Sequence, residues 1–198
     1  MRSRAGAALV ALCAIVPLCL VVAGAASASA GAGASHVLTT GAAVSRVAAA
    51  AVSCKEADLA VSAGESEAGV THVGLPIELR NRGTVACHLQ GYPKVVALSR
   101  AGRVVAVARP TLRGYLGGLP SGIDRPPLVV VAPRKTASAF VEGFDFDVSN
   151  PRDNSCPPYN ALLVTLPGAH KAVRVTLRGV GLCSSLTVHP ILAGPSGR

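Results

Sequence analysis

The sequence predicts an antiparallel β-sandwich with two disulfides, preceded by an export signal and a flexible linker. Three observations lead to this all-β fold class. Apolar and polar residues alternate over short segments, turn-forming residues separate these segments, and four cysteines flank two expected hairpins. Short strands without a long helix are typical of two packed antiparallel sheets.

The composition of the 198-residue chain excludes several classes of protein. Half of the residues (50%) are hydrophobic and 15% are charged, which argues against a wholly disordered chain. Three Phe, three Tyr and no Trp are too few for a surface that stacks single-stranded nucleic acid. The length suffices for one domain with a hydrophobic core.

Residues 1–30 have the three parts of a signal peptide. Arg2 and Arg4 form a basic start, residues 7–23 are apolar and uncharged, and small residues from 24 to 30 offer signal-peptidase sites. We therefore expect a secreted or cell-envelope protein without a membrane span after cleavage. Loss of the two arginines lowers the net charge from +9 to +7. An uncleaved N-terminal anchor is the alternative, because the apolar run approaches the length of a span.

Three further segments follow the signal. Residues 31–53 are mainly Ala, Ser, Gly, Thr and Val, and we expect a flexible linker. The sandwich domain is expected over residues 54–190. Residues 191–198 are expected to form a disordered tail.

The clearest strands are 70–80 and 172–178, where apolar residues alternate with charged ones, as in strands with one buried face. Turn-forming residues at 64–67, 81–83, 101–102 and 167–168 separate the expected strands. The other expected strands are 57–63, 86–90, 94–99, 103–109, 128–132, 136–142 and 161–166. Residues 110–127 are rich in Gly and Pro and are expected to form a long loop.

Signal cleavage leaves four cysteines, and an exported chain meets an oxidising environment. In a hairpin, the start of the first strand lies beside the end of the second. Hairpin geometry therefore favours Cys54–Cys87 and Cys156–Cys183 among the three possible pairings. Each bond contributes roughly 3–4 kcal/mol by the chain-entropy relation. A four-cysteine metal site is the alternative, but the chain has no C-x-x-C pair to support it.

The run NRGTVACHLQGYP at 81–93 is the most distinctive motif. It resembles the signature N-x-G-x-x-x-C-x-L-x-G-Y-P of a family of exported actinobacterial proteins, described only as domain of unknown function number 4232. Pro133 and Ala137 resemble the family's P-G-x-x-A segment, in which Arg134 replaces the glycine. The matching signature residues, besides the four cysteines, are Asn81, Gly83, Gly91, Tyr92 and Pro93.

The resemblance covers residues 54 to about 187. It implies an immunoglobulin-like sandwich that is secreted or attached to the envelope, and it supplies no catalytic residues. The residues themselves indicate a structural role for the motif. Asn81 and Gly83 tolerate left-handed turns, Gly91 and Pro93 bend the chain, and the Tyr92 ring covers an edge of the core.

We find no catalytic, metal or cofactor motif. The run at 64–69 lacks the second glycine of a nucleophile elbow, and no two histidines have the spacing of a metal site. Two alternatives remain open. His72 and His88 flank one expected hairpin and would meet in a weak metal site, and the acidic run from Asp145 to Asp153 would bind Ca²⁺.

We expect a non-catalytic binding or interaction module with an unknown envelope or extracellular partner. Its ligand would lie on loops 110–127 and 143–158, because binding residues concentrate on loops. The alternative is a structural envelope protein, attached through Arg80, Arg174 and Arg178 to an anionic polymer or lipid. A hydrolase with an unrecognised site is the third hypothesis. No motif indicates nucleic-acid binding.

Overall fold

The computed structural model describes residues 52–152 and 156–198. The expected signal peptide (1–30) and most of the expected linker (31–51) lie outside these residues. Within the described residues, regular structure is almost entirely β, and the helical element is the short 3-10 turn η1 (Glu56–Asp58). No helix in this part of the chain is both long and apolar enough to cross a membrane. The all-β prediction is therefore confirmed.

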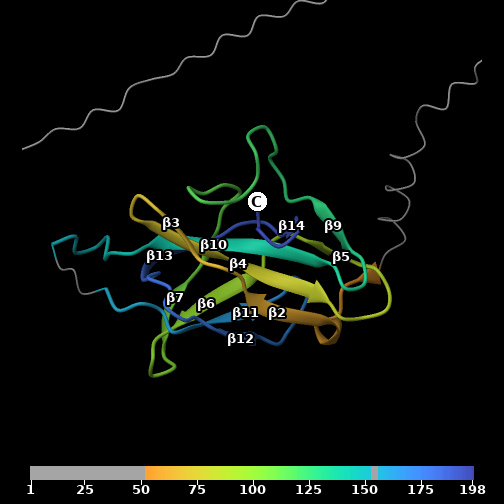
Figure 1. Ribbon diagram of the computed structural model, residues 1–198, viewed down its shortest axis with the longest axis horizontal. Helices are drawn as coiled ribbons and strands as arrows, with labels where there is room; N and C mark the ends of the chain where they lie inside the picture. Colours follow the sequence, from red (N-terminus) through yellow and green to blue (C-terminus); the bar gives the residue numbers. More distant parts are fainter. Residues whose placement is uncertain (1–51, 153–155) are drawn as a thin grey trace, which may run out of the picture. The chain divides into compact units, whose positions relative to one another are not determined.

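The described strands form three sheets (Figure 1). Sheet A contains β1 (Val52–Ser53), β5 (Cys87–Gln90) and β9 (Leu128–Val131). Sheet C has the order β12 (Val173–Thr176), β11 (Ala161–Thr165), β6 (Lys94–Leu98) and β7 (Val104–Val107). Sheet B has the order β2 (Leu59–Ala63), β4 (His72–Asn81), β10 (Thr136–Phe144), β13 (Ser184–Val188) and β8 (Arg109–Pro110). Two short strands complete sheet B, with β3 (Glu67–Gly69) on β4 and β14 (Leu192–Ala193) on β10.

All nine expected strands have a counterpart, and the two expected hairpins are present. β2 pairs antiparallel with β4, and β11 pairs antiparallel with β12. The structure adds five short strands that the sequence analysis did not identify: β1, β3, β8, β13 and β14. Of these, β1 lies at the end of the expected linker and pairs in parallel with β5.

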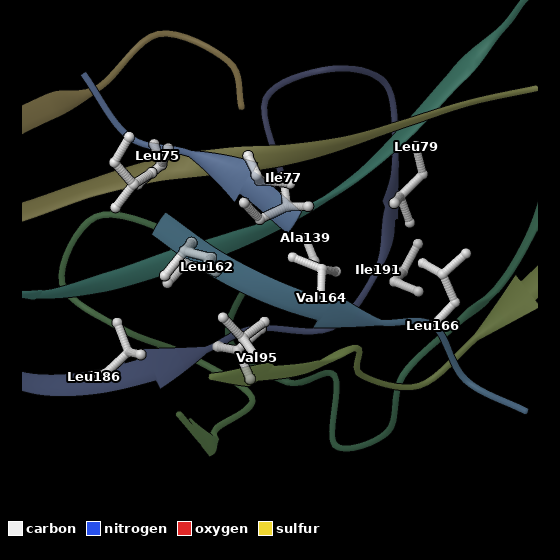
Figure 2. Close-up of a cluster of buried hydrophobic side chains, with 14 of the residues drawn as sticks. Leu75, Ile77, Leu79, Val95, Ala139, Leu162, Val164, Leu166, Leu186 and Ile191 are labelled. Carbon is white, nitrogen blue, oxygen red and sulfur yellow. The ribbon is translucent and has the colours of Figure 1, made fainter. Parts of the chain in front are cut away.

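The core lies between sheets B and C (Figure 2). Leu75, Ile77 and Leu79 of β4 are fully buried and alternate along one face of the strand. They face Leu162 and Val164 of β11, which are buried to the same degree. The alternation seen in the sequence therefore follows the buried face, and the sandwich prediction is confirmed.

A proline within the central strand β4 is accommodated by a gap between its neighbours. β2 ends opposite Ile77 and β3 begins opposite Gly74, so neither strand pairs with Pro76. The carbonyl of Pro76 accepts a hydrogen bond from the Gly64 N–H in this gap at 2.9 Å. The proline nitrogen, which carries no hydrogen, faces the same side as this carbonyl. Because no strand pairs with Pro76 on that side, no strand acceptor there is left without a donor.

The C-terminal segment differs from the expected disordered tail at 191–198. Ile191 is fully buried, and Leu192 of β14 lies opposite Ser138 of β10. Gly197 packs so closely on Phe140 that an added Cβ would lie 2.8 Å from its backbone nitrogen. The expectation was wrong because the small residues that look like a tail allow this close packing, with Ile191 anchoring the segment in the core.

Arg134 occupies a backbone conformation that favours glycine. Its φ is 65°, in the left-handed region, within the turn between β9 and β10. Arg134 therefore has a backbone conformation that glycine adopts without strain, and glycine is the residue that the P-G-x-x-A segment of the family has at this position. Its N–H donates to the Asn81 carbonyl at 2.8 Å, so the turn is also bonded to β4.

We expect Arg134→Gly to raise the free energy of unfolding by about 0.5–1 kcal/mol. Relief of the left-handed strain outweighs the entropy that glycine loses on folding. Urea unfolding measures the change. Lys135→Gly is the control, because the neighbouring residue has no positive φ and the same substitution there is destabilising. Equal destabilisation by both substitutions would contradict the assignment of strain to Arg134.

Candidate functional site

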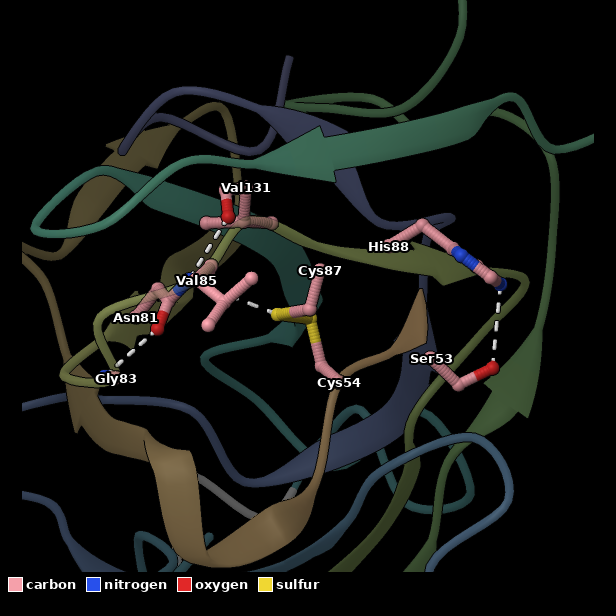
Figure 3. Close-up of a disulfide and its surroundings, with 8 residues drawn as sticks. All are labelled: Ser53, Cys54, Asn81, Gly83, Val85, Cys87, His88 and Val131. Atoms are coloured by element: carbon pink, nitrogen blue, oxygen red, sulfur yellow. Dashed lines mark hydrogen bonds between the residues drawn. A yellow bond between two sulfur atoms is a disulfide. The ribbon is translucent and has the colours of Figure 1, made fainter. Parts of the chain in front are cut away.

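Asn81 organises the motif at 81–93 through its side chain (Figure 3). It is 1% exposed, and its Nδ2 donates to the carbonyls of Val85 and Val131, both at 2.9 Å. Its Oδ1 accepts the Gly83 N–H at 2.8 Å. Asn81 therefore ties the turn after β4 to both β9 and its own loop. The expected left-handed conformation is absent at Asn81 and Gly83, and the side-chain bonds take its place.

The Cys54–Cys87 disulfide lies beside this turn. Cys87 is buried, and its sulfur lies 3.7 Å from the Asn81 Nδ2. The neighbouring residue His88 is hydrogen-bonded to the Ser53 hydroxyl at 3.2 Å. The disulfide and the β1–β5 pair together join the start of the domain to sheet A. The expected pairing is confirmed, with a Cα–Cα distance of 4.8 Å.

The Gly91-Tyr92-Pro93 block connects sheet A to sheet C. Gly91 has a φ of 96°, and its carbonyl accepts the Ile191 N–H at 2.9 Å. Pro93 is buried and Tyr92 is half-buried. Burial raises the pKa of Tyr92 above the ordinary value of 10.0, so its hydroxyl stays protonated at neutral pH. These contacts agree with the structural role that the sequence analysis assigns to the block.

The second disulfide, Cys156–Cys183, borders an open hollow of about 960 Å³. The hollow lies between the β6–β7 turn and the chain on either side of the β11–β12 hairpin. Asp147, Pro157 and Pro158 bring part of the expected ligand loop 143–158 into its wall. A volume of this size lies within the range of small-molecule sites in proteins.

The hollow offers three different polar groups against apolar walls. Arg100, Asp147 and Tyr159 line it together with Val105 and Val180. Burial raises the pKa of Tyr159, and the charge of Asp147 raises it further, so the phenol remains a hydrogen-bond donor. The Ser149 hydroxyl and N–H donate to Asp147 and lower the pKa of its carboxyl, so this carboxylate stays charged. A cation, an anion and a neutral donor can therefore meet one ligand.

A buried carboxylate holds the other expected ligand loop, 110–127, against sheet B. Glu142 of β10 is 4% exposed and accepts the N–H groups of Tyr115 at 2.7 Å and Leu116 at 2.6 Å. Its Oε1 lies 3.6 Å from the Nε2 of His189, which is completely buried. The His189 Nδ1 lies 3.1 Å from the carbonyl of Thr111 and donates to it. The first half of this loop is therefore held in place by internal bonds.

The electrostatics of this cluster favour a charged carboxylate. Burial raises the pKa of Glu142, but the His189 ring and the N–H groups of Leu116 and Tyr115 outweigh burial and lower the pKa below its ordinary value of 4.5. Gly114 packs directly against the carboxylate. A Cβ added at Gly114 would overlap both the Glu142 carboxylate and the His189 ring. The cluster therefore holds the first half of the loop against sheet B.

The family described as "Domain of unknown function (DUF4232)" matches residues 54–191. The chain belongs to this family. No curated protein and no solved structure matches the chain significantly. The match includes the four disulfide-bonded cysteines and the motif at 81–93, so the Asn81 bonds and both disulfides lie within the part of the chain that matches the family.

The structure separates the histidines that the sequence analysis considered together. His72 begins β4 and stacks on Tyr115 with a centroid distance of 4.3 Å. His88 lies beyond the other end of β4, where Asn81 contacts Cys87. Within residues 52–152 and 156–198, no three His, Cys, Asp or Glu side chains are placed to hold a metal ion. Asp153, the end of the acidic run, lies outside the described residues.

We expect Asn81→Ala to lower the free energy of unfolding by about 2–3 kcal/mol, because the buried Val131 carbonyl, the part-buried Val85 carbonyl and the Gly83 N–H lose their partners. Asn81→Asp retains an acceptor for Gly83 but places a carboxylate against the carbonyls, and we expect a loss at least as large. Urea unfolding measures both. Asn150→Ala, at an exposed asparagine, is the control with an expected change within about 0.5 kcal/mol. If Asn81→Ala also changed the free energy of unfolding by no more than about 0.5 kcal/mol, the structural role of the motif would be contradicted.

Proposed function

We propose that the protein is exported and acts outside the cytoplasm as a non-catalytic binding module. The signal-peptide pattern of residues 1–30 supports export, and two disulfides are consistent with an oxidising extracellular environment. We further infer an immunoglobulin-like topology and an actinobacterial source. The sandwich of sheets and the family signature at 81–93 support these inferences.

The observation that carries the binding function is the hollow beside Cys156–Cys183. It combines a volume of about 960 Å³ with Arg100, Asp147 and Tyr159, which differ in charge and hydrogen-bonding character. Ligand sites in proteins join apolar walls to a few polar groups in this way. The disulfide fixes one wall, so little conformational entropy is lost when a ligand binds.

Export is tested by the mass of the mature protein. Expression with the complete N-terminus, followed by mass spectrometry of the N-terminal peptide, is expected to give a chain that begins after residue 28 or 30. A chain that retains Met1 would show an uncleaved anchor and contradict secretion.

Binding in the hollow is tested by filling it. Ala101 lies in its wall, and Ala101→Trp introduces an indole there, whereas Ala68→Trp places the same side chain on the exposed strand β3. The oxidised domain and both variants serve as bait in cell-envelope extracts and culture medium. We expect a specific ligand with the wild type and Ala68→Trp, and its loss with Ala101→Trp. Equal capture by all three would contradict a site in the hollow.

The alternative, electrostatic attachment to an anionic envelope polymer, rests on the net charge of +7 that remains after loss of Arg2 and Arg4. In the structure, Arg80 lies in sheet B and Arg174 in sheet C, so they do not share the face of one sheet. Sedimentation with cell-wall material distinguishes the two functions. Binding that disappears in 0.5 M NaCl and survives Ala101→Trp would favour the electrostatic alternative.

A further inference from the structure

β7 is the outer strand of sheet C, and its exposed side is strongly apolar. In the described residues, it pairs with β6 on one side and with no strand on the other, while β13 of sheet B lies near it and pairs with the chain directly after it, at Arg109 and Pro110. Val104, Val105 and Val107 are 62%, 51% and 56% exposed. Natural sheets usually protect such an edge with charges, proline or a covering segment, because an unpaired edge accepts further strands.

The outer face of sheet C extends this apolar surface inward from the edge. Ala106 packs against the core, so Val107 points to the opposite face. Val107 lies opposite Val96 of β6, and Val96 lies opposite Leu163 of β11. Val96 and Leu163 are half-buried, while their neighbours along each strand are buried in the core. A row of three apolar side chains thus runs across β7, β6 and β11, which lie side by side in Figure 1.

The backbone of β7 has hydrogen-bonding groups directed at the open edge. The Ala108 N–H donates to the Val95 carbonyl of β6 at 2.9 Å. In an antiparallel pair, successive residues direct their N–H and C=O groups alternately toward the partner and away from it. The groups of Val107 therefore point away from β6, toward the space that a further strand would occupy.

Basic side chains flank the strand at both ends. Arg100 and Arg103 precede it and Arg109 follows it, and all three are exposed. The ion pairs among the described residues involve none of them. Carboxylates on an added strand would therefore find cations at each end without displacing an existing pair.

We propose that β7 binds an extended polypeptide segment with acidic ends and apolar alternate residues, which adds a strand to sheet C. The apolar residues would cover Val105 and Val107, and the carboxylates would meet Arg103 and Arg109. The proposal names a partner class for the proposed binding function and rests on it, since Val105 also lines the hollow. A second copy of the chain is a poorer occupant, because antiparallel β7–β7 pairing brings Arg103 close to Arg109 of the other copy.

The test uses a fluorescein-labelled peptide, DEVTVTVED, titrated with the oxidised protein and followed by fluorescence anisotropy. We expect binding that weakens at least about tenfold with the isosteric neutral peptide NQVTVTVQN, because the charge-assisted contacts are lost. Val107→Pro removes the outward N–H without removing a bond to β6, and we expect a loss of about tenfold or more. Val107→Thr keeps the N–H and is the matched control, with binding within about threefold of the wild type.

A charge reversal keeps the test valid if the proline variant fails to fold. Arg103→Glu with Arg109→Glu is expected to weaken binding at least about tenfold, while Arg80→Glu with Arg82→Glu makes the same change in net charge and leaves binding within about threefold. Unchanged binding in both β7 variants, or no binding to the wild type, would overturn the proposal. So would a wild-type dimer that Val107→Pro dissociates, because a second copy would then occupy the edge. If Ala101→Trp loses the envelope ligand and both β7 variants keep it, the hollow remains the proposed site and β7 is excluded as the partner surface.

Discussion

Replacing Cys54 and Cys87 together by serine is expected to lower the free energy of unfolding by roughly 4 kcal/mol. The bond joins residues with a sequence separation of 33, and its loss restores the conformational entropy of that loop to the unfolded chain. Cys87 is also buried, so the serine hydroxyl that replaces its sulfur enters an apolar environment. Urea unfolding of the oxidised wild type and of the double variant measures the difference.

The second disulfide provides the control for this prediction. Cys156 and Cys183 have a separation of 27, and their replacement by serine is expected to cost a similar free energy, because the entropy depends only weakly on loop length. Reduction of the wild type should then produce at least the larger of the two losses. A loss below about 1 kcal/mol in either double variant would show that the unfolded chain gains little freedom there.

Glu142→Ala is expected to lower the free energy of unfolding by roughly 3–5 kcal/mol, because two hydrogen bonds to a charged carboxylate are lost and each contributes about 1.5–3 kcal/mol. The substitution leaves the N–H groups of Tyr115 and Leu116 without their acceptor and leaves the buried His189 ring without its carboxylate. Glu142→Gln keeps one acceptor oxygen and is expected to cost less. Glu65→Ala, in an exposed turn, is the control, with an expected change within about 0.5 kcal/mol.

The same carboxylate predicts a pH dependence of stability. The folded-state pKa of Glu142 is lower than its ordinary value of 4.5, so the unfolded chain takes up the proton first as the pH falls. The stabilisation is complete above pH 4.5 and is lost as the pH falls below it toward the folded-state pKa. Unfolding measured from pH 7 downward should therefore show a smaller decline in Glu142→Gln than in the wild type. Equal declines would assign the acid sensitivity to other carboxyls.

Sequence periodicity was sufficient to predict the strands that carry the core, because each has one apolar face over several residues. It was insufficient for β13, where Ser185 has a φ of 47° and the register with β10 shifts between Glu142 and Phe144. Such a bulge interrupts the alternation on which the prediction depends. The short strands β8 and β14 pair over two residues each, too few to show any period.

The disulfides were predictable because both close local hairpins, whereas the Glu142–His189 cluster joins residues far apart in the sequence. No spacing rule connects these two side chains. One signal was present in the expected strand 136–142, where Glu142 is the only charge among apolar and small residues. A charge in such a strand requires a buried partner, although the sequence does not say which one.

The central pairing of β4 with β10 has a consequence for the order of assembly. Arg80 lies opposite Thr136 and His72 lies opposite Phe144, so the two strands that pair are separated by a long stretch of chain. This intervening chain must be brought into a loop before β4 and β10 can pair. High contact order of this kind slows folding, while each native thiol pair lies within reach of its own hairpin. We expect the local hairpins β2–β4 and β11–β12 to form before β4 joins β10 during refolding. In that interval β4 presents an open apolar edge, and aggregation of refolding intermediates should begin there.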